Sequence, residues 1–452
     1  MNQKEAQPVW RKEALVVLAF VVYVALMVAP FDMAGDQQAI VALLALVAIL
    51  WLSEVTPLFV TALLIPILLV LTTSTDQKTV FAAFADPIIA LFFGSFVIAL
   101  ALAHNGVDLR VSRLLNKLTK GSARGMVFGF LIVAALLGMW ISNTATVSLL
   151  LPAALLVIKS GKLSTKAPRL TKSILFACAM GAAIGGMATP VGTPPNAIAL
   201  RYLLDAGHEI SFTTWFSFGL PLVAILIPAV WFILTRVLSA EQPRIKLATP
   251  KSRAWSAKEI GTLLVLGGTI AAWLTQPLHG ITPAVIALLA AAICFAINLL
   301  TPASLAKVPY QALILFGGGL ALGDAMVRSG LTKTLVDWIT SVVQDQPAML
   351  VLAFLMLFAI ALTTIASNTA SAALLVPIVL SIATQMGIPA VPLVITTTLA
   401  LSIDFLTPIG TPPAALIHST GLVHARDFVR VGSLVSITAA TIIFIGGSFF
   451  LR

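Results

Sequence analysis

The chain has 452 residues, of which 59% are hydrophobic and only 10% are charged, and its mean hydropathy is +1.05. This much apolar sequence exceeds the needs of a soluble core, so the composition indicates a multi-pass membrane protein and excludes a sizeable soluble domain. A net charge of +10 would suit nucleic acid, but its distribution along the chain points to membrane topology instead.

Apolar segments account for most of the chain, and a spanning helix takes about 20 residues. Two stretches, 125–158 and 348–385, are each split by a polar triplet into halves that are too short for an ordinary crossing. We expect each to form a re-entrant helical hairpin whose turn is shielded by protein or lines an aqueous cavity. Eleven further segments are expected to span the membrane: 14–31, 38–52, 57–72, 87–105, 174–188, 214–235, 260–276, 281–300, 311–327, 390–406 and 430–450.

The basic residues predict the orientation of these spans. If the N-terminus is cytoplasmic and both hairpins are re-entrant, 22 of the 27 Lys and Arg residues fall on the cytoplasmic side. Cytoplasmic loops carry such an excess, so we expect the C-terminus to lie outside. Segment 108–120 alternates charged and apolar residues and predicts an amphipathic helix at the inner surface, and 331–343 has a similar character on the outer side.

Three features occur twice, in the same order. The first is a glycine-containing span, with Leu-Phe-Phe-Gly at 91–94 in one copy and Leu-Phe-Gly-Gly at 315–318 in the other. The second is the triplet Ser-Asn-Thr at 142–144 and 367–369, with a proline eight residues after the threonine. The third is the string T-P-x-G-T-P-P at 189–195 and 407–413. An odd number of spans separates the copies, so the repeats are inverted, which is typical of secondary transporters that bind substrate near the midplane.

Both repeated motifs suit a site for an anion together with a cation. Proline removes a backbone donor and clashes with the preceding turn, so each T-P-x-G-T-P-P string should break its helix. Ser and Thr are good helix N-caps, and helix N-termini favour anions. Hydroxyls, amide oxygens and free carbonyls are ligands for hard cations. Neither hairpin contains Lys, Arg or His, so bound sodium ions are the natural means of neutralising an anionic substrate.

At these motifs the chain resembles the divalent anion:sodium symporter family, in particular its bacterial sodium-coupled C4-dicarboxylate transporters. The resemblance covers nearly the whole chain. It implies an all-α integral membrane fold in which a dimerising scaffold supports a transport domain that moves as an elevator. It also implies a bacterial inner-membrane location, a homodimer, a small dicarboxylate such as succinate, malate or fumarate as substrate, and sodium ions as the co-transported species without an organic cofactor.

The resemblance also implies a division of the chain and a set of site residues. Scaffold parts would be 1–124 and 259–347, and transport parts 125–235, with a broken helix at 174–203, and 348–452, with a broken helix at 390–420; a cytoplasmic linker would be 236–258. The substrate would be bound by Ser142, Asn143, Thr144, Thr193, Ser367, Asn368, Thr369, Thr411 and Pro412. One sodium ion would be bound by Gly138, Ser142, Asn143 and Gly192, and the other by Thr363, Ala366, Asn368 and Gly410.

Three residues depart from the family's pattern. Gly138 stands where a hydroxyl residue is expected, whereas Thr363, its counterpart in the second repeat, keeps the hydroxyl. Thr364 stands where a glutamate is common. Ala414 replaces an asparagine that the first repeat keeps as Asn196. We therefore expect the two cation sites to differ in strength.

Four acidic residues lie in or near the spans. Asp404, close to the second broken helix, is a functional candidate that would tune the second cation site or carry a proton, with a pairing to Ser402 or water as the alternative. Asp324 is interpreted as structural, and Glu54 and Asp86 as solvated loop-edge residues.

Several functions remain open on the sequence. The leading hypothesis is sodium-coupled dicarboxylate uptake. The alternatives are a dicarboxylate, citrate or sulfate transporter that works as an anion exchanger or a proton-coupled symporter. An exchanger should carry a basic side chain in place of a sodium ion, and none is evident. An enzyme would need clustered catalytic or metal-binding residues, which are absent from the sequence pattern, and the paired inverted motifs argue against a channel.

Overall fold

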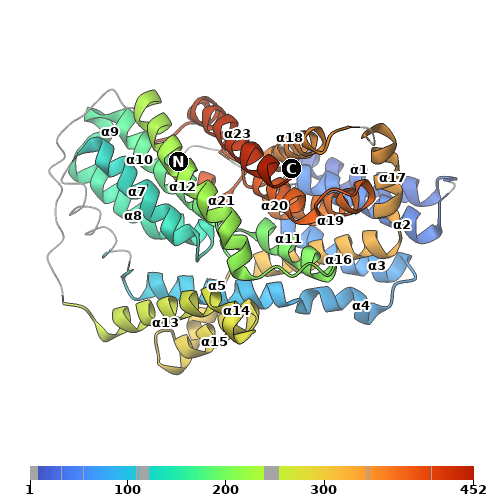
Figure 1. Cartoon of the computed structure of the whole chain (residues 1–452), viewed down its shortest axis with the longest axis horizontal. Helices are drawn as coiled ribbons and strands as arrows, with labels where there is room; N and C mark the ends of the chain where they lie inside the picture. Colours follow the sequence, from blue (N-terminus) through green and yellow to red (C-terminus); the bar gives the residue numbers. More distant parts are fainter. Residues whose placement is uncertain are drawn as a thin grey trace.

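The computed structural model describes residues 9–31, 33–53, 55–107, 110, 122–238, 254–343, 346–408 and 410–451. These residues form helices and connecting loops, with no strand among them, as the composition predicts (Figure 1). Apart from Arg110, the predicted surface helix at 108–120 lies outside the described residues, as does most of the predicted linker 236–258. The second predicted surface helix is present as α17 (Leu331–Val343).

Each polar triplet lies where the second helix of a hairpin begins, as predicted. The first hairpin consists of α7 (Ala123–Gly138) and α8 (Asn143–Ser160), and the second of α18 (Ala348–Ile365) and α19 (Asn368–Met386). The expectation that each half is too short to cross was wrong for α8, α18 and α19, which are among nine helices of the described residues long and apolar enough to span a membrane. Pro152 and Pro377 lie inside α8 and α19 without ending them.

Both T-P-x-G-T-P-P strings interrupt a helix, which confirms that prediction. The first break separates α10 (Pro168–Gly186) from α11 (Pro194–Asp205), and the second separates α20 (Ala390–Ala400) from α21 (Pro412–His418). Prolines stand at the start of α11 and α21. Their missing N–H costs no hydrogen bond there, because the first amides of a helix have no partner within it.

The remaining helices complete the two repeats. In the first repeat α5 (Pro87–His104) precedes the hairpin and α12 (Phe212–Val237) follows the broken helix, and α16 (Tyr310–Arg328) and α23 (Ser433–Phe450) take these places in the second. The other elements are α1 (Val9–Val28), α2 (Gly35–Ser53), α3 (Leu58–Thr72), α4 (Gln77–Ala82), α9 (Leu163–Lys166), α13 (Ala257–Leu274), α14 (Gln276–His279), α15 (Pro283–Ala296) and α22 (Ala425–Asp427).

Side-chain contacts join loops that the predicted topology places on the same side of the membrane. Among residues predicted to be cytoplasmic, Arg110 pairs with Glu259 at 3.0 Å and Lys172 with Asp427 at 2.8 Å. On the side predicted to be external, Gln37 donates to the Ser329 carbonyl at 2.8 Å and Gln385 to Asp337 at 2.7 Å. In Figure 1, α9 of the first side lies at the left end of the molecule, and α4 and α17 of the second side lie at the right end.

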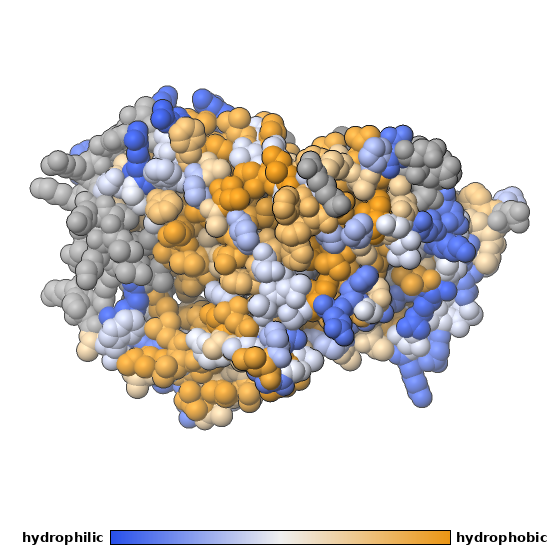
Figure 2. Space-filling view, viewed as in Figure 1, coloured by the Kyte–Doolittle hydropathy of each residue, from blue (hydrophilic) through white to orange (hydrophobic). Residues whose placement is uncertain are grey.

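Apolar side chains cover most of the face shown in Figure 2, and hydrophilic ones concentrate toward its left and right ends. Many large apolar residues are exposed along the long helices, for example Leu264 on α13 and Leu357 on α18, at 70% and 67%. Such exposure is costly in water and favourable against lipid tails, so the structure is that of a membrane-embedded helical protein.

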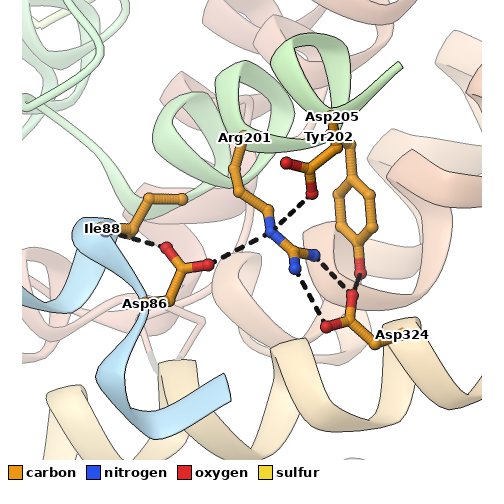
Figure 3. Close-up of polar contacts among 6 residues, drawn as sticks. All are labelled: Asp86, Ile88, Arg201, Tyr202, Asp205 and Asp324. Atoms are coloured by element: carbon orange, nitrogen blue, oxygen red, sulfur yellow. Dashed lines mark hydrogen bonds and ion pairs between the residues drawn. The ribbon is translucent and has the colours of Figure 1, made fainter. Parts of the chain in front are cut away.

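Arg201 forms a dense ion-pair cluster between α11 and two other helices (Figure 3). Its guanidinium pairs with Asp324 of α16 through two nitrogens, at 2.5 and 2.9 Å, and lies 3.2 Å from Asp86 and 3.0 Å from Asp205. Tyr202 also points its hydroxyl at Asp324, at 3.5 Å. Asp324 is therefore structural, as predicted, whereas the interpretation of Asp86 as merely solvated was wrong: it pairs with Arg201 and accepts from the Ile88 amide at the start of α5.

We expect the Arg201 cluster to stabilise the fold. Replacing Arg201 with Met leaves Asp324 and Asp86 partly buried without their cation. We expect the free energy of unfolding to fall by about 2 kcal/mol, a value between those for exposed and buried ion pairs. The melting temperature of the purified protein should therefore fall by several degrees. Arg328→Met, at an exposed residue of the same predicted side, should leave it unchanged. In a double-mutant cycle, Asp324→Asn should cost less in the Arg201→Met background than alone. Additive losses would contradict the pairing.

Candidate functional site

The two hairpin turns meet at one cavity of about 830 Å³. Its wall also includes the starts of α11 and α21 and parts of α5 and α16. The structure thus brings together residues from both repeats that are more than 200 positions apart in the sequence. All nine predicted substrate-binding residues line this cavity: Ser142, Asn143, Thr144, Thr193, Ser367, Asn368, Thr369, Thr411 and Pro412.

The triplet serines fix how the second hairpin helices begin. The Ser142 hydroxyl accepts from the Ala145 amide at 3.3 Å, and the Ser367 hydroxyl accepts from the Ala370 amide at 3.4 Å. Each serine is therefore the N-cap of its helix, with the Asn and Thr in the first turn beside the cavity. Since Thr193 and Thr411 precede α11 and α21, four helices begin at the cavity wall, and partial positive charge at these N-termini favours an anion there.

The two helix breaks share one local turn. The Gly192 amide donates to the Thr189 hydroxyl at 3.1 Å, and the Gly410 amide donates to the Thr407 hydroxyl at 3.0 Å. The two breaks differ four residues after this glycine. Asn196, buried in the first break, donates its amide at 2.9 Å to the carbonyls of both Gly186 and Thr189, whereas Ala414 at the matching position has no polar side chain.

The four residues of the first predicted cation site lie close together. Asn143 has its side-chain oxygen buried without a hydrogen-bond partner. A β-carbon placed on Gly186 would lie 2.7 Å from this oxygen and 3.1 Å from the Gly192 carbonyl, and one placed on Gly192 would lie 2.7 Å from the Gly138 carbonyl. Side-chain and carbonyl oxygens therefore converge where glycine allows the backbones to approach, and Ser142 adjoins them as the N-cap.

The second predicted cation site has a hydroxyl that the first lacks. Thr363, fully buried, has its hydroxyl oxygen 2.7 Å from Asn368 Oδ1 and 2.8 Å from the Leu401 carbonyl. One hydroxyl proton cannot satisfy both acceptors, so oxygen atoms outnumber protons here, as a cation site requires. Ala366 ends α18 beside the triplet, and Gly410 lines the cavity.

Two features of the site were missed by sequence reasoning. Lys307, exposed at the end of the short 3-10 helix Pro302–Lys307 before α16, lines the cavity and is the one charged residue among its described lining residues. Phe92, Phe96 and Phe316 add an apolar wall. Lys307 belongs to no repeated motif, because the segment before α16 reaches the site only through tertiary packing. Phe92 and Phe316 stand in the repeated segments 91–94 and 315–318, which paired these two spans in the sequence without indicating that their rings line the cavity.

Known proteins similar to this chain are membrane transporters. A family model described as CitMHS, citrate transporter, matches residues 48–363 and 270–452. An uncharacterized transporter of Haemophilus influenzae is 33% identical over 93% of both chains. The sodium-dependent dicarboxylate transporter SdcS of Staphylococcus aureus is 28% identical over 92% of this chain and 86% of its own. The solved Alcanivorax borkumensis YdaH transporter shares the fold, with a TM-score of 0.59 at 14% identity over 82% of this chain and 86% of that one.

We expect Asn196 to hold the first helix break together. Asn196→Ala leaves the carbonyls of Gly186 and Thr189 buried without their donor, which costs about 1–3 kcal/mol. The melting temperature of the purified protein should therefore fall clearly below that of the wild type. Leu204→Ala removes more volume from the same helix α11, but at an exposed position, and should have little effect. Equal melting temperatures for the wild type and Asn196→Ala would contradict this role.

Proposed function

Because the chain belongs to the citrate transporter family, we propose that it is a secondary active transporter that couples sodium influx to the uptake of a C4-dicarboxylate such as succinate, malate or fumarate. The membrane-spanning fold and the transporter relatives establish a transport protein, and the resemblance to the divalent anion:sodium symporters is confirmed. The substrate and the coupling ion are the proposal.

The observation that carries the proposal is that the cavity has no charged side chain at the triplets, although several helix N-termini form its wall. Four helices begin at its wall, and two Ser-Asn-Thr triplets face it, so it offers donors to two carboxylates. Its one charged residue among those described, Lys307, is exposed at the end of the short 3-10 helix before α16, where it is suited to attract an anion rather than to neutralise one at the triplets. Two cation sites beside the triplets would supply the missing positive charge.

Sodium is the coupling ion that the surroundings favour. The two predicted sites offer hydroxyl, amide and carbonyl oxygens, which suit a hard cation. The similarity to a protein named for sodium-dependent dicarboxylate transport supports the same pairing of ion and substrate. Citrate, which the family's description names, is the second candidate substrate.

An elevator movement would carry the site across the membrane. The cavity extends toward Lys307 and Ala103, which are predicted to be near the cytoplasmic side, while Arg201, Asp86 and Asp324 join helices on the predicted outer side. Arg201 belongs to the proposed transport part 125–235, and the two aspartates belong to the proposed scaffold parts 1–124 and 259–347. The cluster would close the outer side in this state and open when the transport part moves. A homodimer held by the scaffold, in the bacterial inner membrane with a cytoplasmic N-terminus, completes the proposal.

Uptake into proteoliposomes tests the coupling. Labelled succinate should accumulate when sodium is imposed inward, and accumulation should disappear when potassium or choline replaces sodium. Citrate and sulfate serve as competing substrates in the same assay. Uptake that is independent of sodium but requires dicarboxylate inside the vesicles would establish exchange in place of symport. Uptake driven by a proton gradient alone would establish proton coupling.

The triplet asparagines should be indispensable. Asn143→Ala and Asn368→Ala each remove an amide from the cavity wall and an oxygen from a cation site, so each should reduce sodium-driven succinate uptake by at least about 100-fold. Ser381→Ala is the matched control, because this hydroxyl bonds only the Pro377 carbonyl of its own helix α19. Uptake should be normalised to reconstituted protein with an unchanged melting temperature; near wild-type activity in either asparagine variant would remove the proposed site.

A further inference from the structure

Asp404 is a buried acid without a partner. It lies in the second helix break, between α20 and α21, and only 4% of its surface is exposed. Neither carboxylate oxygen has a hydrogen-bond partner. The alternative interpretation from the sequence, a pairing with Ser402, is not what the structure shows, since the Ser402 hydroxyl is likewise buried and unpaired. An isolated buried carboxylate is costly, so this position needs an explanation.

The internal repeat shows where the Asp404 side chain is directed. Asp404 lies three residues before Thr407, as Gly186 lies three residues before Thr189, so the two positions correspond. In the first repeat, a β-carbon on Gly186 would point at Asn143 Oδ1 and the Gly192 carbonyl, the oxygens of the first cation site. The equivalent direction in the second repeat leads to Asn368 and Gly410.

The contact with Gly410 supports this direction. A β-carbon placed on Gly410 would clash with both oxygens of the Asp404 carboxylate, with Oδ2 at 2.5 Å. Gly410 thus has the carboxylate packed directly against its backbone. The Asp404 side chain occupies the space that, in the first repeat, is left open by Gly186.

No basic side chain of the packed helices faces this carboxylate. Asp404 follows α20, which packs against α18, α19, α23 and α11. The first three contain no Lys, Arg or His, and the one basic residue of α11, Arg201, is held by Asp86, Asp205 and Asp324. The oxygens of Thr363, Asn368 and Leu401 at the second predicted cation site share a single hydroxyl proton, so they add acceptors and no positive charge.

We propose that the Asp404 carboxylate is an additional ligand of the second cation site, which makes this site anionic while the first remains neutral. The inference rests on the proposed sodium coupling and adds to it which of the two sites binds its cation more tightly. A full negative charge beside the oxygens of Thr363 and Asn368 attracts a cation far more than carbonyl dipoles alone do. The second site therefore binds its cation more tightly and fills first.

Sodium-dependent stabilisation of the purified protein, without substrate, tests this inference. The melting temperature of the wild type should rise with sodium chloride at constant ionic strength set with choline chloride. In Asp404→Asn, the sodium concentration at half of the maximal rise should increase by about tenfold or more. Asp205→Asn, an exposed acid of the Arg201 cluster, is the matched control and should keep the wild-type midpoint.

The sodium-free melting temperature separates a ligand from a structural role. In choline alone, Asp404→Asn should melt at or above the wild-type temperature, because it removes an uncompensated buried charge while keeping the shape. A structural carboxylate would give a lower value in choline and in sodium alike. Asp404→Ala, with the smaller side chain that the Gly186 position implies, should show the same weakened response to sodium if the Asn variant fails to fold.

The same melting-temperature titrations with potassium chloride and lithium chloride distinguish failure of the inference from failure of the proposed function. An unchanged sodium midpoint in both Asp404 variants overturns the ligand role and leaves sodium coupling intact. If only potassium or lithium stabilises the wild type, sodium coupling fails, and the ratio of variant to wild-type midpoints for that ion decides the role of Asp404. If none of the three cations stabilises the wild type, both proposals fall.

Discussion

The site depends on helix N-termini that begin in the middle of the molecule. A helix that starts there exposes amides which no preceding turn can satisfy, and the bilayer offers no water to satisfy them. The hydroxyls of Ser142 and Ser367 satisfy one amide each, and the Asn and Thr residues that follow each serine line the cavity. The requirement for a polar cavity and the ability to hold an anion therefore have the same origin. The T-P-x-G-T-P-P breaks add two more such starts with prolines that need no partner.

Much of this arrangement could be predicted from the sequence, because the motifs act locally. Proline and glycine break a helix wherever they occur, and serine caps one, so the turns at 142 and 367 and the breaks at 189 and 407 were placed correctly. The inverted relation of the repeats followed from counting spans. The residues that these motifs bring together line one cavity, although their roles in binding stay proposals.

What the sequence could not predict depends on packing between distant helices. The Arg201 cluster joins residues 86, 201 and 324, and nothing in the local pattern of any one of them indicates the other two. Asp86 looked solvated because it is flanked by a loop, yet it both caps α5 and pairs with Arg201. The hairpin helices were misjudged for a different reason: three of the four halves reach the 18 or 19 residues of a possible span, because the Asn and Thr of each triplet belong to the second helix of the hairpin.

The two repeats differ at two matching positions of their helix breaks, and these differences make the two predicted cation sites unequal. In the first break, position 186 is a glycine, and the buried Asn196 donates its amide to the carbonyls of Gly186 and Thr189, so this break carries no charge. In the second break, aspartate at 404 and alanine at 414 place a charge there and omit the amide. A carboxylate can only accept hydrogen bonds, and no donor faces it in the second break, so a bound cation would be its natural partner. Under the proposed ligand role, the charge that Asp404 adds to the second break is therefore balanced by the ion that binds there, whereas the first break needs no such charge.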